Sequence, residues 1–236
     1  MISNALIQNI PSSSSISQMS NEIAKQIQQY GFLKLECLEE QRCPSTFFDS
    51  DFKTYPVYYA KHYKTNDKIF KAPYGAFDIL GEKNCPKILL QTVKPILIKL
   101  MESFSVFLGK KKDYLFDISK KNNYQIYAYA REKQFIHHIK NELVDGEISF
   151  EPHKDISLFT FSFIPEIEVL SPDKKWLRYQ DEPNTYAVWV GSQMEELTNN
   201  KIKSTIHRVR RFDSSNVLFF GKLEIKTNLV CNETAR

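Results

Sequence analysis

The sequence has few cysteines, and they are not arranged as a metal site or a disulfide framework. Its 236 residues contain four of them, Cys37, Cys43, Cys85 and Cys231, with no C-x-x-C pair. Widely spaced cysteines of this kind are typical of free thiols in a reducing compartment. We therefore expect a cytoplasmic protein.

Long apolar runs are also lacking. No segment approaches the roughly 20 apolar residues that a membrane-spanning helix needs, and the N-terminus has no basic region followed by an apolar core, as a signal peptide would. We expect no membrane span and no secretory leader.

A strong charge of one sign is absent as well. The formal net charge is +4, and the densest basic run, residues 207–211, is short. Without a basic groove or a ladder of aromatic residues, nucleic acid is not the expected partner. A small-molecule substrate is the default.

What the sequence does have is enough apolar residues to form the core of one sizeable domain over residues 1–236, because 42% of its residues are hydrophobic and 13% aromatic.

Residues 1–15 are expected to be a flexible leader. Residues 16–123 are expected to form a helical N-terminal region, with an opening helix capped by Ser17 or Ser20 and ended at Gly31, and a helix over 87–108 kinked at Pro95. A strand is expected at 32–37, and residues 43–81 are expected to be irregular.

The second part of the chain, residues 124–222, is rich in short β-type segments separated by turn formers. The expected strands are 124–130, 147–151, 156–163, 166–170, 175–179, 185–190, 203–210 and 215–220. The sequence thus predicts a mainly β fold with flanking helices: a double-stranded β-helix, that is, a jelly-roll or cupin-like barrel.

Two histidines and one aspartate in this part could hold a metal. His153 and Asp155 are two residues apart and would point to the same side of a strand, and His207 follows on another β-rich segment. Two imidazoles and one carboxylate on one face of Fe(II) leave positions open for substrate and oxygen. The alternative is a surface His-Asp pair and an unrelated histidine.

Several segments resemble, in order, those of the 2-oxoglutarate- and Fe(II)-dependent dioxygenases, and specifically their isopenicillin N synthase-like branch. Residues 153–160 resemble the family's H-x-D-x-x-x-L-T, and residues 197–209 resemble T-N-G-x-Y-K-S-x-x-H-R-V. Residues 187–192 resemble V-V-N-I-G-D, with Trp189 where the family has Asn. The resemblance implies the double-stranded β-helix, His153, Asp155 and His207 as iron ligands, and 2-oxoglutarate and molecular oxygen as co-substrates.

The sequence departs from the family where 2-oxoglutarate is usually anchored. The family's R-x-S binds the distal carboxylate, and the aligned residues here are Ser214 and Asn216. Arg211 shares strand parity with His207 and is one candidate replacement; Lys222 is a weaker one. A buried carboxylate without a positive partner is costly, so the identity of the co-substrate depends on this site.

Residues 124–129 resemble the family strand that ends in N-Y-Y-P. Tyr129 falls on the tyrosine that helps to hold 2-oxoglutarate, and Tyr127 shares its parity. The two tyrosines could equally be core residues of a small barrel.

Three hypotheses follow. The first is an oxygenase that couples 2-oxoglutarate decarboxylation to hydroxylation, desaturation or cyclisation of a small molecule. The second is an Fe(II) oxidase of the isopenicillin N synthase or aminocyclopropane-carboxylate oxidase kind, which uses no 2-oxoglutarate. The third is a non-catalytic binding module on the same fold.

Overall fold

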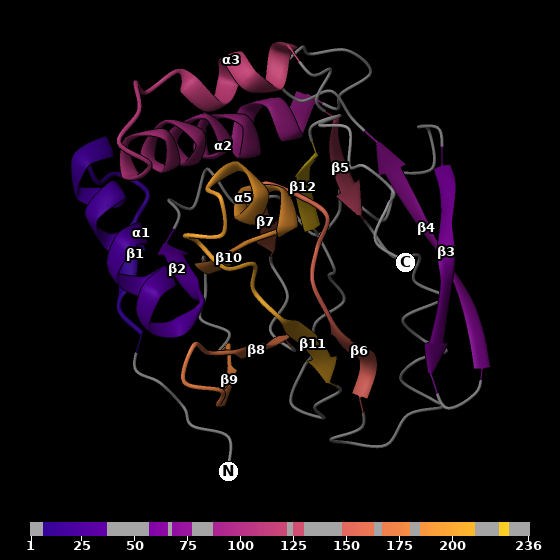
Figure 1. The fold of residues 1–236 in the computed structure, drawn as a ribbon. Coiled ribbons are helices and arrows are strands. Elements are labelled where there is room, and N and C mark those ends of the chain that lie inside the picture. Colours follow the sequence, from indigo (N-terminus) through magenta and orange to yellow (C-terminus); the bar gives the residue numbers. More distant parts are fainter. Residues whose placement is uncertain are drawn as a thin grey trace.

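The fold consists of two β-sheets with helices packed on one side (Figure 1). A computed structural model describes residues 7–36, 57–65, 68–76, 87–121, 125–129, 148–162, 167–179, 185–210 and 222–226. Among these residues, no helix combines the length and apolar character that crossing a membrane requires.

The larger sheet has eight strands in the order β1-β2-β10-β7-β12-β5-β4-β3. All of its neighbouring strands pair antiparallel except β1 and β2, which are parallel. Its strands are β1 (Asn9–Pro11), β2 (Phe32–Glu36), β3 (Val57–Thr65), β4 (Lys68–Ala76), β5 (Gln125–Tyr129), β7 (Phe159–Ser162), β10 (Thr185–Val190) and β12 (Lys222–Lys226).

The smaller sheet has four antiparallel strands in the order β6-β11-β8-β9. They are β6 (Ile148–His153), β11 (His207–Arg210), β8 (Ile167–Leu170) and β9 (Trp176–Arg178). The expected turn former 171–173 lies between β8 and β9, where Ser171 and Lys175 exchange hydrogen bonds. The arrangement of the two sheets is consistent with the expected barrel.

Both faces of β10 are buried, and this explains why its sequence, TYAVWV, contains no charged residue. Tyr186, Val188 and Val190 join the core cluster that contains the helices' apolar side chains. Ala187 and Trp189 point the other way and join a second cluster with residues of β8 and β9. The alternation of a β-strand therefore sends Trp189 into the space between the two sheets.

Two helices cover the outer face of this sheet and pack against each other: α1 (Ile16–Tyr30) and α2 (Lys87–Phe107). Ile23 of α1 and Leu100 and Phe104 of α2 are completely buried there. The shorter α3 (Tyr114–Lys121) packs on α2. The expectation of a long helix here is confirmed; α2 continues through Pro95, and Gly109 beyond its end has the positive φ (68°) that suits glycine.

The N-terminal expectation was wrong in two respects. Residues 9–11 form β1 rather than part of a flexible leader, because Ile10 is buried and the strand pairs with residues 34–36 of β2. The N-cap of α1 is Ser15, not Ser17 or Ser20: its hydroxyl accepts from the Gln18 backbone, while the Gln18 side chain accepts from the Ser15 N–H. The expected end at Gly31 is confirmed, with φ 82°.

Residues 16–123 are not purely helical. β3 and β4 pair as an antiparallel hairpin within the stretch that was expected to be irregular, with Thr65 opposite Lys68. Their aromatic and β-branched residues favour strands, and only two residues, Asn66 and Asp67, separate them in sequence. The strand expected at 215–220 lies outside the described residues.

Candidate metal centre

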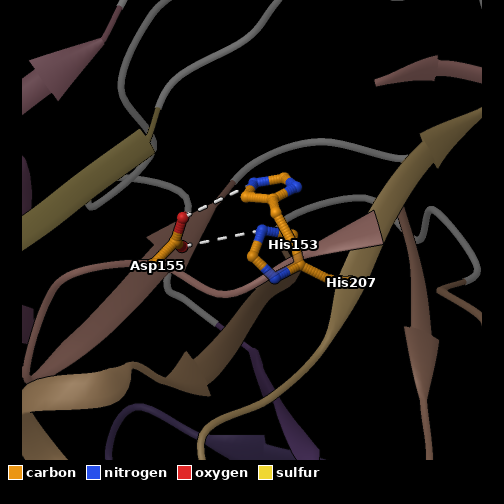
Figure 2. A group of neighbouring side chains, drawn as sticks. All are labelled: His153, Asp155 and His207. Atoms are coloured by element: carbon orange, nitrogen blue, oxygen red, sulfur yellow. Dashed lines mark ion pairs between the residues drawn. The ribbon is translucent and has the colours of Figure 1, made fainter. Parts of the chain in front are cut away.

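The structure brings His153, Asp155 and His207 together between the two sheets (Figure 2). Each offers one ligand atom, and these atoms lie within 4.8 Å of one another. Asp155 Oδ1 is 3.7 Å from His153 Nε2, and Asp155 Oδ2 is 3.6 Å from His207 Nε2. Among the described residues, these three form the group of His, Cys, Asp or Glu side chains whose ligand atoms lie close enough together to hold one metal ion.

The two histidines meet because β6 and β11 pair directly. His207, the first residue of β11, is opposite His153, the last residue of β6. Side chains of directly opposed residues in an antiparallel pair lie next to each other, and the two ring centroids are 4.2 Å apart.

Asp155 reaches the site in a different way from the expected one. It lies beyond the end of β6, so same-side projection along one strand does not account for its position. The loop that carries it is held by backbone hydrogen bonds from Ser192 N to Asp155 O (2.8 Å) and from Gln193 N to Ser157 O (3.0 Å). These donors lie at the start of a short helix, α5 (Ser192–Leu197), which the sequence did not predict.

Each imidazole has its Nδ1 next to a backbone carbonyl. His153 Nδ1 is 2.8 Å from Glu151 O, and His207 Nδ1 is 3.3 Å from Thr205 O. A carbonyl only accepts hydrogen bonds, so this contact favours the tautomer with the proton on Nδ1 and leaves the Nε2 lone pair on the side of Asp155. That is the orientation a metal ligand requires.

Solvent reaches the three side chains to different extents. The side chains of Asp155 and His207 are 3% and 2% exposed, whereas that of His153 is 28% exposed. His153 is therefore the member of the group that solvent reaches.

Asp155 also receives hydrogen bonds from two neighbours whose role the sequence did not predict. Trp189 Nε1 donates to Asp155 Oδ2 at 2.9 Å, and Thr160 Oγ1 donates to the same oxygen at 2.6 Å. The available signal was chemical: a buried indole N–H must find an acceptor. From the sequence, Trp189 was noted only as the residue that stands where the resembled family has Asn.

The residues expected at the co-substrate site are not brought to this centre by described contacts. Arg211, Ser214 and Asn216 lie outside the described residues. Tyr127 and Tyr129 are in β5, opposite Glu224 and Lys222 of β12, and their side chains lie outside the described part of the chain. Their roles stay predictions.

Comparisons with known proteins agree with this geometry. Residues 121–220, which include all three clustered side chains, match the sequence profile of the 2OG-Fe(II) oxygenase superfamily. Among curated proteins, DMR6-like oxygenase 1 of Arabidopsis thaliana is 27% identical over 119 residues, half of this chain and 32% of that protein. Isopenicillin N synthase of Penicillium chrysogenum is 28% identical over 118 residues, 47% of this chain and 36% of that protein.

Among solved structures, a 2OG-Fe(II) oxygenase family protein from Caulobacter crescentus superposes with a TM-score of 0.64 at 14% identity, over 95% of this chain and 87% of that one. This likeness shows a shared fold. The match to the 2OG-Fe(II) oxygenase superfamily is confined to residues 121–220, less than half of the chain. The matched segment spans about a third of the length of the curated relatives.

Proposed function

We propose that this protein is a non-haem Fe(II) oxygenase in which His153, Asp155 and His207 hold the iron. The observation that carries the proposal is the convergence of three polar side chains, two of them almost fully buried, on one point. Burying a carboxylate and an imidazole in a core costs free energy unless they are paired or bind a metal, and barrel stability requires neither residue.

The donor set fits Fe(II). Two imidazole nitrogens and one carboxylate oxygen are the ligands of the facial iron sites that activate oxygen, and they leave coordination positions open. The backbone carbonyls next to both Nδ1 atoms supply the outer contacts that usually orient metal-bound histidines.

We further propose that 2-oxoglutarate is the co-substrate and a small molecule the substrate. With molecular oxygen as the oxidant, bound Fe(II) and 2-oxoglutarate would supply the chemistry of this superfamily, in which 2-oxoglutarate becomes succinate and carbon dioxide while the substrate is oxidised. The chain's part is to orient these groups and exclude water. Trp189 and Val169, both buried beside His207, provide apolar surroundings on the closed side, and the exposed edge of His153 marks the open side.

The proposal includes a single domain with a double-stranded β-helix, which the two sheets and the likeness to the Caulobacter crescentus protein support. It also includes a cytoplasmic location and a metabolite rather than nucleic acid as substrate, both of which rest on sequence composition alone.

A specific observation favours a second candidate, an Fe(II) oxidase that uses no 2-oxoglutarate. Ser214 and Asn216 occupy the positions aligned with the family's carboxylate-binding Arg and Ser, and neither carries a positive charge. Arg211, Tyr127, Tyr129 and Lys222 are the residues that could replace them. If none of these side chains binds a carboxylate, the oxidase becomes the better proposal.

An anaerobic Fe(II) titration with and without 2-oxoglutarate tests these proposals. We expect saturable Fe(II) binding and, with 2-oxoglutarate, the visible charge-transfer absorption of an iron-chelated keto acid. Both should be lost in His207→Ala and kept in the matched control His62→Ala, whose residue lies in β3. Iron binding without the band would favour the oxidase.

The third hypothesis, a non-catalytic binding module, makes the opposite prediction for His153→Ala. An enzyme loses iron binding and any oxygen consumption in this variant. A scaffold without metal keeps its stability or becomes more stable, because a polar side chain at a crowded site has been removed. If the wild type binds no Fe(II) at all, the module is the remaining hypothesis.

A further inference from the structure

Trp189 contacts two of the three clustered side chains. Its side chain is 1% exposed. The indole nitrogen is 2.9 Å from Asp155 Oδ2, and the indole ring centroid is 4.7 Å from that of His207. One side chain therefore touches both buried members of the site.

Thr160 supplies a second donor to the same oxygen from the neighbouring strand. Trp189 of β10 and Thr160 of β7 are directly opposite in the ladder, so their side chains point to the same face of the sheet. Thr160 is completely buried, and its hydroxyl is 2.6 Å from Asp155 Oδ2. Ser157 Oγ, 3.2 Å from the Thr160 hydroxyl, extends this network.

Both of these donors reach the same carboxylate oxygen of Asp155, Oδ2. A carboxylate oxygen has two lone-pair sites, so the indole N–H and the threonine O–H together satisfy Oδ2. Oδ1 is the oxygen on the side of His153, 3.7 Å from its Nε2. Hydrogen bonds to a charged carboxylate are stronger than those between neutral groups and fix its plane.

We propose that Trp189 and Thr160 are positioning residues that make Asp155 a one-oxygen metal ligand, bound through Oδ1. The proposal rests on the proposed function, because it requires a metal at His153, Asp155 and His207. Because β7 pairs with β10, both donors reach Oδ2, and the carboxylate gives the metal one oxygen rather than two. A coordination position that a second carboxylate oxygen would fill stays available to an incoming ligand.

The test uses Co(II) as the probe, because its visible absorption reports coordination number and geometry. Four proteins are compared anaerobically: the wild type, Trp189→Phe, Thr160→Val and the control Trp176→Phe. The control removes the second of the two tryptophans; Trp176 stacks on Arg208, with the guanidinium 3.9 Å from its ring centroid, and has no contact with Asp155 among those described. Co(II) affinity is measured by competition with a chelator of known affinity.

We expect Trp189→Phe to bind Co(II) about 10- to 100-fold more weakly than the wild type, the usual effect of removing a hydrogen bond to a metal ligand. Its Co(II) absorption should weaken and shift, because a carboxylate released from one donor can bind through both oxygens. Thr160→Val should change the spectrum in the same direction. Trp176→Phe should match the wild type in affinity and spectrum.

A variant that keeps the shape of the side chain covers the case in which Trp189→Phe does not fold. Replacing Trp189 by 3-benzothienylalanine exchanges the N–H for sulfur and retains the two fused rings. If this variant binds Co(II) with wild-type affinity and spectrum, the positioning role is overturned even though the metal centre stands. If wild type and Trp176→Phe both fail to bind Co(II), the proposed metal centre itself is overturned.

Discussion

The backbone of Gly191 lies so close to Ser157 that a Cβ atom at position 191 would be 2.4 Å from both the carbonyl oxygen and the hydroxyl of Ser157. The same Cβ would lie 2.8 Å from the carbonyl oxygen of Asp155. Gly191 N donates in turn to Leu158 O at 3.1 Å. The residue before α5 and the loop that carries Asp155 are thus in direct backbone contact.

Gly191→Ala should therefore displace the Asp155 loop. We expect a loss of at least about 2 kcal/mol in the free energy of unfolding, as for other overpacked sites, and weaker Fe(II) binding. Urea denaturation and an anaerobic Fe(II) titration measure the two effects.

The control variant is Gly109→Ala. A Cβ there meets nothing within 4 Å, but φ is +68°. Gly109→Ala should lose about 1 kcal/mol of unfolding free energy and bind Fe(II) as tightly as the wild type. Equal iron affinity in both variants would contradict the prediction.

Arg208 and Glu168 form a second buried pair next to the centre, on the strands that carry His207 and Val169. Arg208 Nε donates to Glu168 Oε2, and the Arg208 and Glu168 side chains are 13% and 0% exposed. Arg208→Met leaves the buried carboxylate without this charge partner, so we expect a destabilisation of about 3 kcal/mol.

The control for Arg208→Met is Lys25→Met, which removes a partner of Glu22 at 3.9 Å in a pair whose side chains are 58% and 36% exposed. Its effect should stay below about 0.5 kcal/mol. Both values come from chemical denaturation. Similar losses in the two variants would show that burial does not govern the strength of these pairs.

The capping box of α1 gives a test of the corrected helix start. Ser15→Ala removes the acceptor of the Gln18 backbone N–H and should cost about 1 kcal/mol of unfolding free energy. Ser17→Ala, at the exposed position that the sequence suggested as a cap, should be nearly neutral. Thermal denaturation compares the two. A larger loss for Ser17→Ala would return the helix start to its expected place.

Glu195 makes the stability of the α5 region depend on pH. Burial acts to raise the pKa of the Glu195 carboxyl. Hydrogen bonds from Ser204, Lys154 and Lys203 together outweigh this effect and bring the pKa from the usual 4.5 down to about 2. Because the folded pKa is lower than the unfolded one, the stabilisation is present above about pH 4.5 and is lost as the pH falls towards 2. It amounts to about 1–3 kcal/mol.

Glu195→Gln should therefore flatten the decline in stability between about pH 5 and pH 3, while Glu196→Gln, at a neighbouring position in the same helix, should leave it as in the wild type. Urea midpoints across this pH range are the measurement. A wild-type slope in Glu195→Gln would exclude the Glu195 network as its source.

The sequence predicted the clustered residues better than the path that brings them together. His153, Asp155 and His207 were singled out because their residue types suit iron and because the segments around them resemble the 2-oxoglutarate- and Fe(II)-dependent dioxygenases; the structure brings the three together. The position of Asp155 past the end of β6 was not predictable, because it depends on backbone hydrogen bonds from α5, which begins at Ser192, far along the chain. Residue spacing predicts only the geometry within one strand, whereas this contact joins two segments that are far apart in the sequence.

The strand prediction succeeded where the sequence alternates or is continuously apolar, as in β10. It failed where a segment becomes a strand only because a neighbouring strand pairs with it. β1 has three residues and no pattern of its own; it exists because β2 offers an edge. The hairpin of β3 and β4 was hidden by breakers, since Pro73 and Gly75 lie inside β4. Trp189 was recognised as unusual, but only the fold shows which oxygen its N–H reaches.

The parallel pairing of β1 with β2 has a consequence for solubility. β1 is the outermost strand of the eight-stranded sheet, and behind it β2 pairs with β10. Without residues 7–12, the hydrogen-bonding groups of residues 34–36 would become an open edge made of Lys34, Leu35 and Glu36. Open edges recruit strands from other molecules. A chain shortened at this end should therefore fail first by aggregating, even though the missing residues lie far in sequence from the proposed iron ligands.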